Sequence, residues 1–80
     1  MNYQQIKALS NGDCLQFLED YEYVTEFKTF IIPKGTWMVM VGCSLRGYTF
    51  RYEGDIEAPC SFGKKRLRKM KLKKIGAVHL

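Results

Sequence analysis

The chain has 80 residues, a length that suits one domain with a single modest core and leaves no room for a second. Hydrophobic residues make up 46% of it and charged residues 26%, which indicates a folded domain over residues 1–80 and argues against a disordered tail. Its apolar runs are far shorter than the roughly 20 residues that cross a bilayer, so we expect no membrane partner.

The net charge of +5 is unevenly distributed along the chain. Residues 1–62 contain five Lys or Arg and eight Asp or Glu, a balance of −3, whereas residues 63–80 contain eight Lys or Arg and no acid. Clustered cations attract polyanions over a Debye length, roughly 8 Å at physiological salt. We call residues 63–80 the basic segment, and its composition points to a polyanionic partner.

The N-terminal residues predict a short helical turn. Tyr3, Ile6 and Leu9 recur at a spacing of three, and the Asn-Gly pair at 11–12 then ends the pattern. The stretch "DCLQFLED" follows, in which Leu15 and Phe17 share one face. Alternation of this kind predicts a first strand.

Residues 19–27 mix acids with aromatics and show no clean period. We expect a long excursion here, from which aromatic side chains pack back onto the domain. Strand character then returns up to Pro33, and the sequence "IPKGT" predicts a turn or sharp bend because proline donates no ladder hydrogen bond and Gly35 accommodates positive φ.

The most apolar strand is predicted for "TWMVMVGCS", beginning at Thr36. Trp37 is expected to be a core anchor, while Met38 and Met40 on the other face form a second core layer or an exposed strip used for dimerisation. The next stretch, "LRGYTFRYEGD", predicts a turn and a strand with one aromatic face, which pairs with its predecessor as a hairpin and belongs to the core.

Two patterns overlap in the basic segment. The residues "KMKLK" alternate, which favours a strand over about residues 66–74 with Met70 and Leu72 facing inward. A helix is the alternative, because Leu67, Met70, Ala77 and Val78 fall within one sector of a helical wheel. Gly76 disfavours a long helix, so the strand is the preferred interpretation.

The residues "NGDCLQFLEDYE", "IPKGTWMVMV" and "YTFRYEGD" resemble small SH3-like barrel domains of bacterial and phage proteins. The resemblance is one of turns and strands and covers about residues 11–56. It implies an all-β, mainly antiparallel, five-stranded barrel that binds nucleic acid or protein and is not an active-site scaffold. Closure into a barrel would also hide the sheet edges of so small a domain.

The residues that carry chemistry argue against an enzyme, a cofactor or a bound metal. The one histidine, His79, is nearly terminal, and the acids cluster at 19–26 and 53–57 without a matching base. The three cysteines, Cys14, Cys43 and Cys60, are widely spaced and lack the spacing of a zinc site. Their odd number favours a reducing cytoplasm.

The basic segment has two interpretations. Lysines on an exposed edge strand prevent unwanted strand pairing, and that explanation needs no ligand. Eight cations without an interspersed acid repel one another, however, which favours contact with DNA or RNA phosphates. The predicted contacts are Lys64, Lys65, Arg66, Arg68, Lys69, Lys71, Lys73 and Lys74, extended by Arg46 and Arg51 if their hairpin faces the same side.

A protein-interaction module is the alternative function. In that hypothesis the chain is a small phage- or plasmid-encoded regulator or inhibitor that docks on a host protein through residues 19–27. Tyr21, Tyr23 and Phe27 are the predicted anchors, since aromatic residues dominate interface hot spots. Either function suits a monomer or a weak homodimer, and the sequence does not distinguish DNA from RNA or single from double strands.

Overall fold

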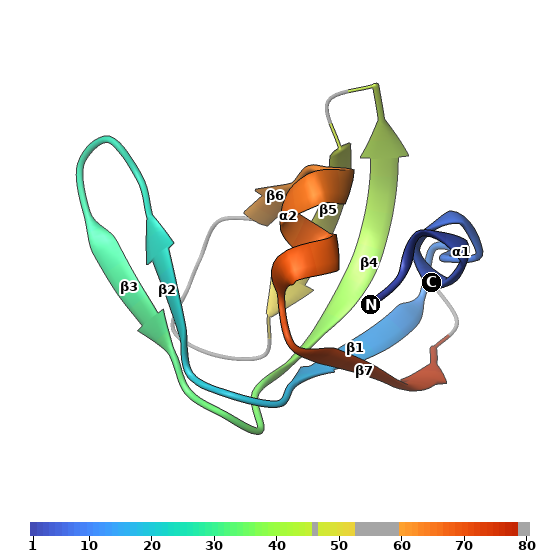
Figure 1. Ribbon diagram of the computed structural model, residues 1–80, viewed down its shortest axis with the longest axis horizontal. Coiled ribbons are helices and arrows are strands. Elements are labelled where there is room, and N and C mark those ends of the chain that lie inside the picture. Colours follow the sequence, from blue (N-terminus) through green and yellow to red (C-terminus); the bar gives the residue numbers. More distant parts are fainter. Residues whose placement is uncertain (46, 53–59, 79–80) are drawn as a thin grey trace.

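The structure is a computed structural model that describes residues 1–45, 47–52 and 60–78 (Figure 1). The predicted contact Arg46, the acids at 53–57 and His79 lie outside the described residues. In chain order the elements are α1 (Tyr3–Lys7), β1 (Asp13–Phe17), β2 (Tyr21–Val24), β3 (Thr29–Ile32), β4 (Trp37–Ser44), β5 (Gly47–Tyr52), β6 (Cys60–Phe62), α2 (Lys64–Lys69) and β7 (Leu72–Ala77). A mainly antiparallel β protein with a short N-terminal helical turn is therefore confirmed.

The main sheet has five strands in the order β6-β5-β4-β1-β7, and all its pairings are antiparallel. The last strand of the chain thus returns beside the first. β6 and β7 lie at the two edges, and within the described ranges no pairing joins them. The sheet is open there, so closure into a five-stranded barrel is not confirmed.

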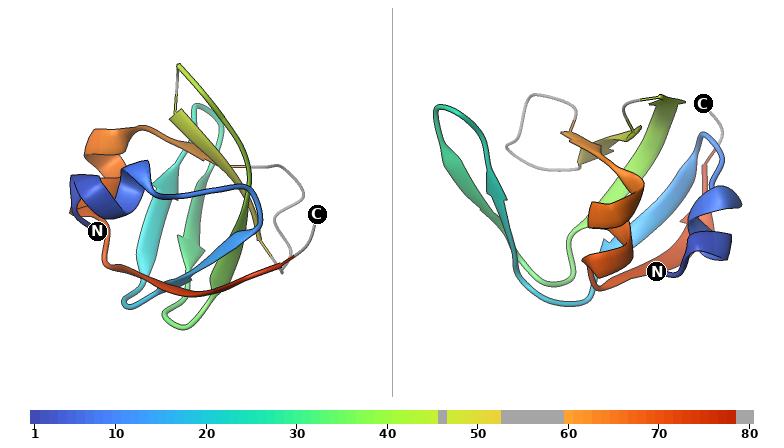
Figure 2. Two further views of the ribbon diagram at one scale, coloured as in Figure 1. Left: turned by 90° about the vertical axis from the view of Figure 1, so that its right-hand side faces the viewer. Right: turned by 45° about the horizontal axis from the view of Figure 1, so that its top comes forward.

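A separate hairpin, β2–β3, projects away from the main sheet, as Figures 1 and 2 show. Its register runs from Tyr21 opposite Ile32 to Val24 opposite Thr29. We expected an irregular excursion over residues 19–27, and that interpretation is wrong over residues 21–24. The alternating letters "YEYV" and "TFII" place Tyr21 and Tyr23 toward the core and their neighbours toward solvent, which is the period of a strand.

The buried face of β4 is the one that carries Met38 and Met40, which confirms a core layer, one of the two roles predicted for this face. Met38 and Met40 are fully buried, whereas Trp37 and Val39 on the other face are only half-buried. The prediction that Trp37 anchors the core is therefore wrong. Both faces of this strand are apolar, so alternation alone does not determine which one faces inward.

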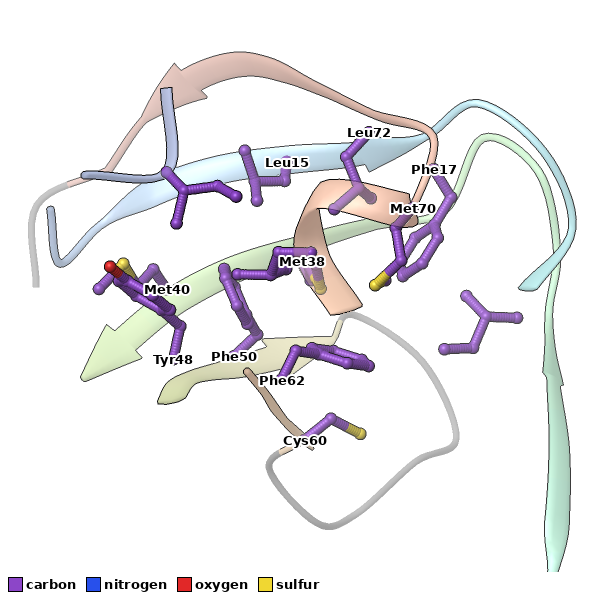
Figure 3. Packing of buried hydrophobic residues seen from close by; sticks show 13 residues of the cluster. Leu15, Phe17, Met38, Met40, Tyr48, Phe50, Cys60, Phe62, Met70 and Leu72 are labelled. Atoms are coloured by element: carbon purple, nitrogen blue, oxygen red, sulfur yellow. The ribbon is translucent and has the colours of Figure 1, made fainter. Parts of the chain in front are cut away.

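The core forms between the inner face of the sheet and α2. Figure 3 shows side chains from β4 and β5 in one buried layer with residues that border α2. Tyr48 and Phe50 of β5 belong to this cluster and Tyr52 packs against it, which confirms the aromatic face predicted for that strand as core. Leu67 is the residue of α2 that is fully buried.

The basic segment is a helix followed by a strand, rather than a strand from residue 66. Leu67 and Met70, three positions apart, both reach the core, as one face of a helix requires. Met70 then has extended backbone angles and ends α2. Leu72 begins β7 opposite Phe17, and the strand includes Gly76. Each of the two patterns in the sequence is therefore correct for one half of the segment.

Candidate nucleic-acid interface

Five of the predicted contacts lie on α2, and all five are exposed. Gly63 precedes the helix with extended backbone angles, and no side chain caps the first turn. The first turn contains no acid, and like charges three or four residues apart disfavour a helix by about 0.2–0.5 kcal/mol per pair. Burial of Leu67 therefore holds α2 in place, and the cations cover its remaining surface. They are Lys64, Lys65, Arg66, Arg68 and Lys69.

Three of these cations meet α1 in a shallow hollow of about 240 Å³. It is lined by Tyr3, Lys65, Arg68 and Lys69, and we call it the Tyr3 hollow. The guanidinium carbon of Arg68 lies 4.7 Å from the centroid of the Tyr3 ring, a cation–π contact. α1 and α2 lie against each other here, as Figure 2 shows.

A second hollow continues this surface past the start of α2. Its volume is about 750 Å³, and Lys64 and Lys65 form one side of it beside the β4–β5 turn. Lys65 lines both hollows, so the cations of α2 are continuous from one to the other. Among the described residues, neither lining includes a carboxylate.

Arg66 lies apart from this surface, on the side of α2 that faces the β2–β3 hairpin. Burial, with Cys60 close by, raises the pKa of the Tyr23 phenol above its ordinary value, and the positive charge of Arg66 acts in the opposite direction. Arg66 is therefore electrostatically coupled to Tyr23. Its direction from the helix axis differs from that of Arg68 because two residues turn an α-helix through about 200°.

The lysines of the second half of the segment follow β7. Lys73 is paired with Gln16 of β1, and Lys71 is exposed just before the strand. Lys74 forms an ion pair with Asp13 at 3.5 Å. This is the one ion pair found among the described residues, so Lys74 is the cation of the segment whose charge a carboxylate of the domain offsets there.

The structure does not bring Arg51 to this surface. Phe50 points into the core beneath α2, and successive residues of a strand point to opposite faces. Arg51, opposite Val39, is therefore on the outer face of the sheet. The extension of the patch to Arg51 is not supported by this placement, and Arg46 lies outside the described residues.

Of the three anchors predicted for protein interaction, two pack on the core and one is exposed. The Tyr21 ring lies 5.8 Å from that of Phe17, and the Tyr23 ring lies 5.5 Å from that of Phe62, so both tyrosines pack on the core. Phe27, in contrast, is 94% exposed between β2 and β3. The sequence analysis missed Val24 and Ile31, which are also exposed on the outward face of this hairpin. The strict alternation of the two strands is the signal that identifies them.

Tyr3 is the other residue that the sequence analysis did not assign to a site. The spacing of three placed it in a helical turn, but nothing in the sequence indicates that this turn lies against α2.

The described residues contain no group of three or more His, Cys, Asp or Glu placed to hold a metal ion. Within the same residues, neither helix has the length and apolar character needed to traverse a bilayer.

We compared the chain with protein-family models, with curated proteins and with solved structures, and none of these comparisons found a match.

Proposed function

We propose that this chain is a non-enzymatic nucleic-acid-binding domain that contacts backbone phosphates through α2. The observation that carries the proposal is the continuous row of exposed cations along two hollows, whose linings contain no carboxylate in the part of the chain that the structure describes. Lys64, Lys65, Arg68 and Lys69 form this row, which we call the α2 row. Lys71 and Lys73 add charge nearby on the same segment.

Electrostatics gives the reason for binding. The cations of the α2 row repel one another in the free protein, and a chain of phosphates relieves that repulsion while releasing its own condensed counterions. Contact with four phosphates of a duplex corresponds to a slope of about −3.5 for the logarithm of affinity against the logarithm of salt concentration. Phosphate contacts position a protein without reading bases, so this surface implies no sequence specificity.

We further propose that the domain is an SH3-like module that acts in the cytoplasm. The return of β7 beside β1 and the long hairpin between β1 and β4 support the resemblance in strand arrangement. The odd number and wide spacing of the three cysteines support a reducing compartment.

The test is a fluorescence-anisotropy titration of a labelled oligonucleotide at several salt concentrations. We expect affinity to fall about 100-fold between about 50 and about 200 mM salt. Replacing Lys65, Arg68 and Lys69 with Gln should remove most of the binding and flatten the slope. Absence of binding by the wild-type protein at about 50 mM salt would refute the proposal.

A matched control removes the same number of charges from elsewhere. The control variant carries Lys28→Gln, Lys34→Gln and Arg51→Gln, three exposed positions that line neither hollow. We expect it to bind with nearly wild-type affinity. Equal losses in the two triple variants would mean that net charge alone drives binding and that the α2 row is not the site.

One observation favours a second candidate function, docking of a protein partner on the β2–β3 hairpin. Val24 is 60% exposed and Ile31 is 62% exposed, and together with Phe27 they form an apolar surface beside Glu22 and Glu26. This composition suits a partner with an apolar surface flanked by cations.

Pull-downs from nuclease-treated lysate distinguish the two functions. Under the second function, a partner protein is retained by the wild type and by the Lys65, Arg68 and Lys69 variant, but lost when Val24→Thr, Phe27→Ser and Ile31→Thr are combined. A partner retained by the hairpin variant contradicts docking at this surface.

A further inference from the structure

Tyr3 has a contact that binding of phosphates alone does not require. The guanidinium carbon of Arg68 lies 4.7 Å from the centroid of its ring, and Tyr3 as a whole residue is still 39% exposed. Lys65 and Lys69 complete the hollow around this pair. Lysine and arginine heads suffice to neutralise phosphates, so the aromatic ring adds a second kind of binding surface.

The fold holds this ring in place. Asn2 Oδ1 accepts a hydrogen bond from the backbone N–H of Gln5 at 2.8 Å, and Gln5 Oε1 accepts one from the backbone N–H of Asn2 at 2.9 Å. This capping box fixes the first turn of α1, in which Tyr3 lies. Ile6, one turn later, is fully buried and fastens α1 to the core. The Tyr3 ring is therefore presented at the junction of the two helices by a fixed backbone.

We propose that the Tyr3–Arg68 pair is a stacking site for an unpaired base of single-stranded nucleic acid. This inference rests on the proposed function, because Lys65 and Lys69 are assigned to the phosphates that flank the base. Unpaired bases stack on aromatic rings and on guanidinium planes, and Tyr3 and Arg68 offer one of each in contact. The bases of a duplex are already stacked on their neighbours, so the site favours single strands.

A purely structural cation–π contact is the competing explanation, since such pairs also stabilise folded proteins. The two explanations differ in what they predict for ligand binding. A structural pair affects single strands and duplexes equally, whereas a stacking site affects single strands selectively.

The test compares a single strand with a duplex of the same sequence, using Tyr3→Leu. We expect its affinity for the single strand to fall about fivefold or more, with duplex affinity within about twofold of wild type. Its salt slope should stay unchanged because no charge is removed. The matched control is Phe27→Leu, which removes an exposed ring from the hairpin, and it should bind both ligands as the wild type does.

Arg68→Lys supplies a second, independent variant. It keeps the positive charge but loses the planar group, so we expect a larger loss of affinity for the single strand than for the duplex, with the salt slope unchanged for both. A third variant, Tyr3→Trp in a Trp37→Phe background, reports on stacking directly. Its fluorescence should be quenched saturably by the single strand and not by the duplex.

The outcomes separate this inference from the proposed function. If the wild type binds but Tyr3→Leu and Arg68→Lys lose no affinity, or lose it equally for both ligands, the stacking site is overturned and phosphate binding stands. If the wild type binds neither ligand, the proposed function itself fails. Should Tyr3→Leu prove unfolded by circular dichroism, the tryptophan variant decides, and unquenched fluorescence with bound single strand overturns the stacking site.

Discussion

The ammonium group of Lys74 on β7 lies 3.5 Å from Oδ1 of Asp13 on β1. The Asp13 side chain is only 6% exposed, and its Oδ2 also accepts a hydrogen bond from the Ser10 amide at 2.9 Å. The pair therefore links the last strand of the sheet to the first. It also commits the charge of Lys74 to the domain itself.

Lys74→Gln and Lys69→Gln should consequently have different effects. Lys74 is 52% exposed, so loss of its ion pair should lower the free energy of unfolding by about 0.5–1 kcal/mol in a urea titration. It should leave the salt slope of nucleic-acid binding nearly unchanged. Lys69→Gln should leave stability unchanged and reduce the slope by about 0.9 for a duplex. A large slope change for Lys74→Gln would contradict this division of roles.

Leu67→Ala should detach α2 from the core. Leu67 is the fully buried residue of this helix, and truncating a buried leucine costs about 2–5 kcal/mol of unfolding free energy. Because Leu67 is the main contact between α2 and the core, with Met70 at the end of the helix, the cations of α2 should lose their fixed position and affinity for nucleic acid should fall as well. Arg66→Ala is the matched control on the exposed side, and urea denaturation should place it close to wild type. A stable Leu67→Ala protein would show that α2 is held by other contacts.

Gly47→Ala should destabilise the β4–β5 hairpin more than Gly35→Ala destabilises its own turn. Both glycines have positive φ, 139° and 90°, so each substitution strains the backbone by about 1 kcal/mol or more. A Cβ at Gly47 would in addition lie 2.5 Å from the carbonyl oxygen of Phe62, whereas one at Gly35 meets nothing within 4 Å. Thermal unfolding of the two variants measures the difference, and equal midpoints would contradict the close approach of β6.

Stability should fall at high pH because of Tyr52. Burial, reinforced by nearby Cys60 and Tyr23, raises the pKa of the Tyr52 phenol above its ordinary value. Below about pH 10 the phenol is neutral in both the folded and the unfolded chain, and above it the unfolded chain ionises first. The free energy of unfolding should therefore decrease as pH rises beyond that point.

Tyr52→Phe isolates this effect from the titration of the lysines, which both proteins share. Urea denaturation from about pH 9 to about pH 11 should show a smaller decrease for the variant than for the wild type. Parallel pH profiles would mean that Tyr52 titrates alike in the folded and unfolded chains.

Much of the architecture follows from local patterns in the sequence. The Asn-Gly pair at 11–12 forms the turn that leads into β1, "IPKGT" bends the chain, and the aromatic alternation of β5 gives both a strand and its inward face. Periodicity does not choose between two apolar faces, and so the sequence predicted Trp37 as a core anchor while leaving Met38 and Met40 as either a core layer or an exposed strip. The buried face of β4 is the one that α2 covers, and α2 lies far from β4 in the sequence.

The sequence predicted which segment is basic, but not which of its side chains share one surface. The basic segment is evident from its charge, yet the ion pair of Lys74, the outward direction of Arg51 and the position of Arg66 each depend on contacts between distant elements. Tyr3 is the clearest case, because more than sixty residues separate it from Arg68. No local period carries such information.

β7 is an edge strand, and Lys71 and Lys73 give that edge its positive charge. Like charges keep such edges from joining across molecules. A polyanion that cancels this charge also removes the barrier to edge-to-edge assembly. Mixtures near charge equivalence should therefore turn turbid and clear again when salt or excess oligonucleotide is added, and binding constants are best measured with the protein well below that ratio.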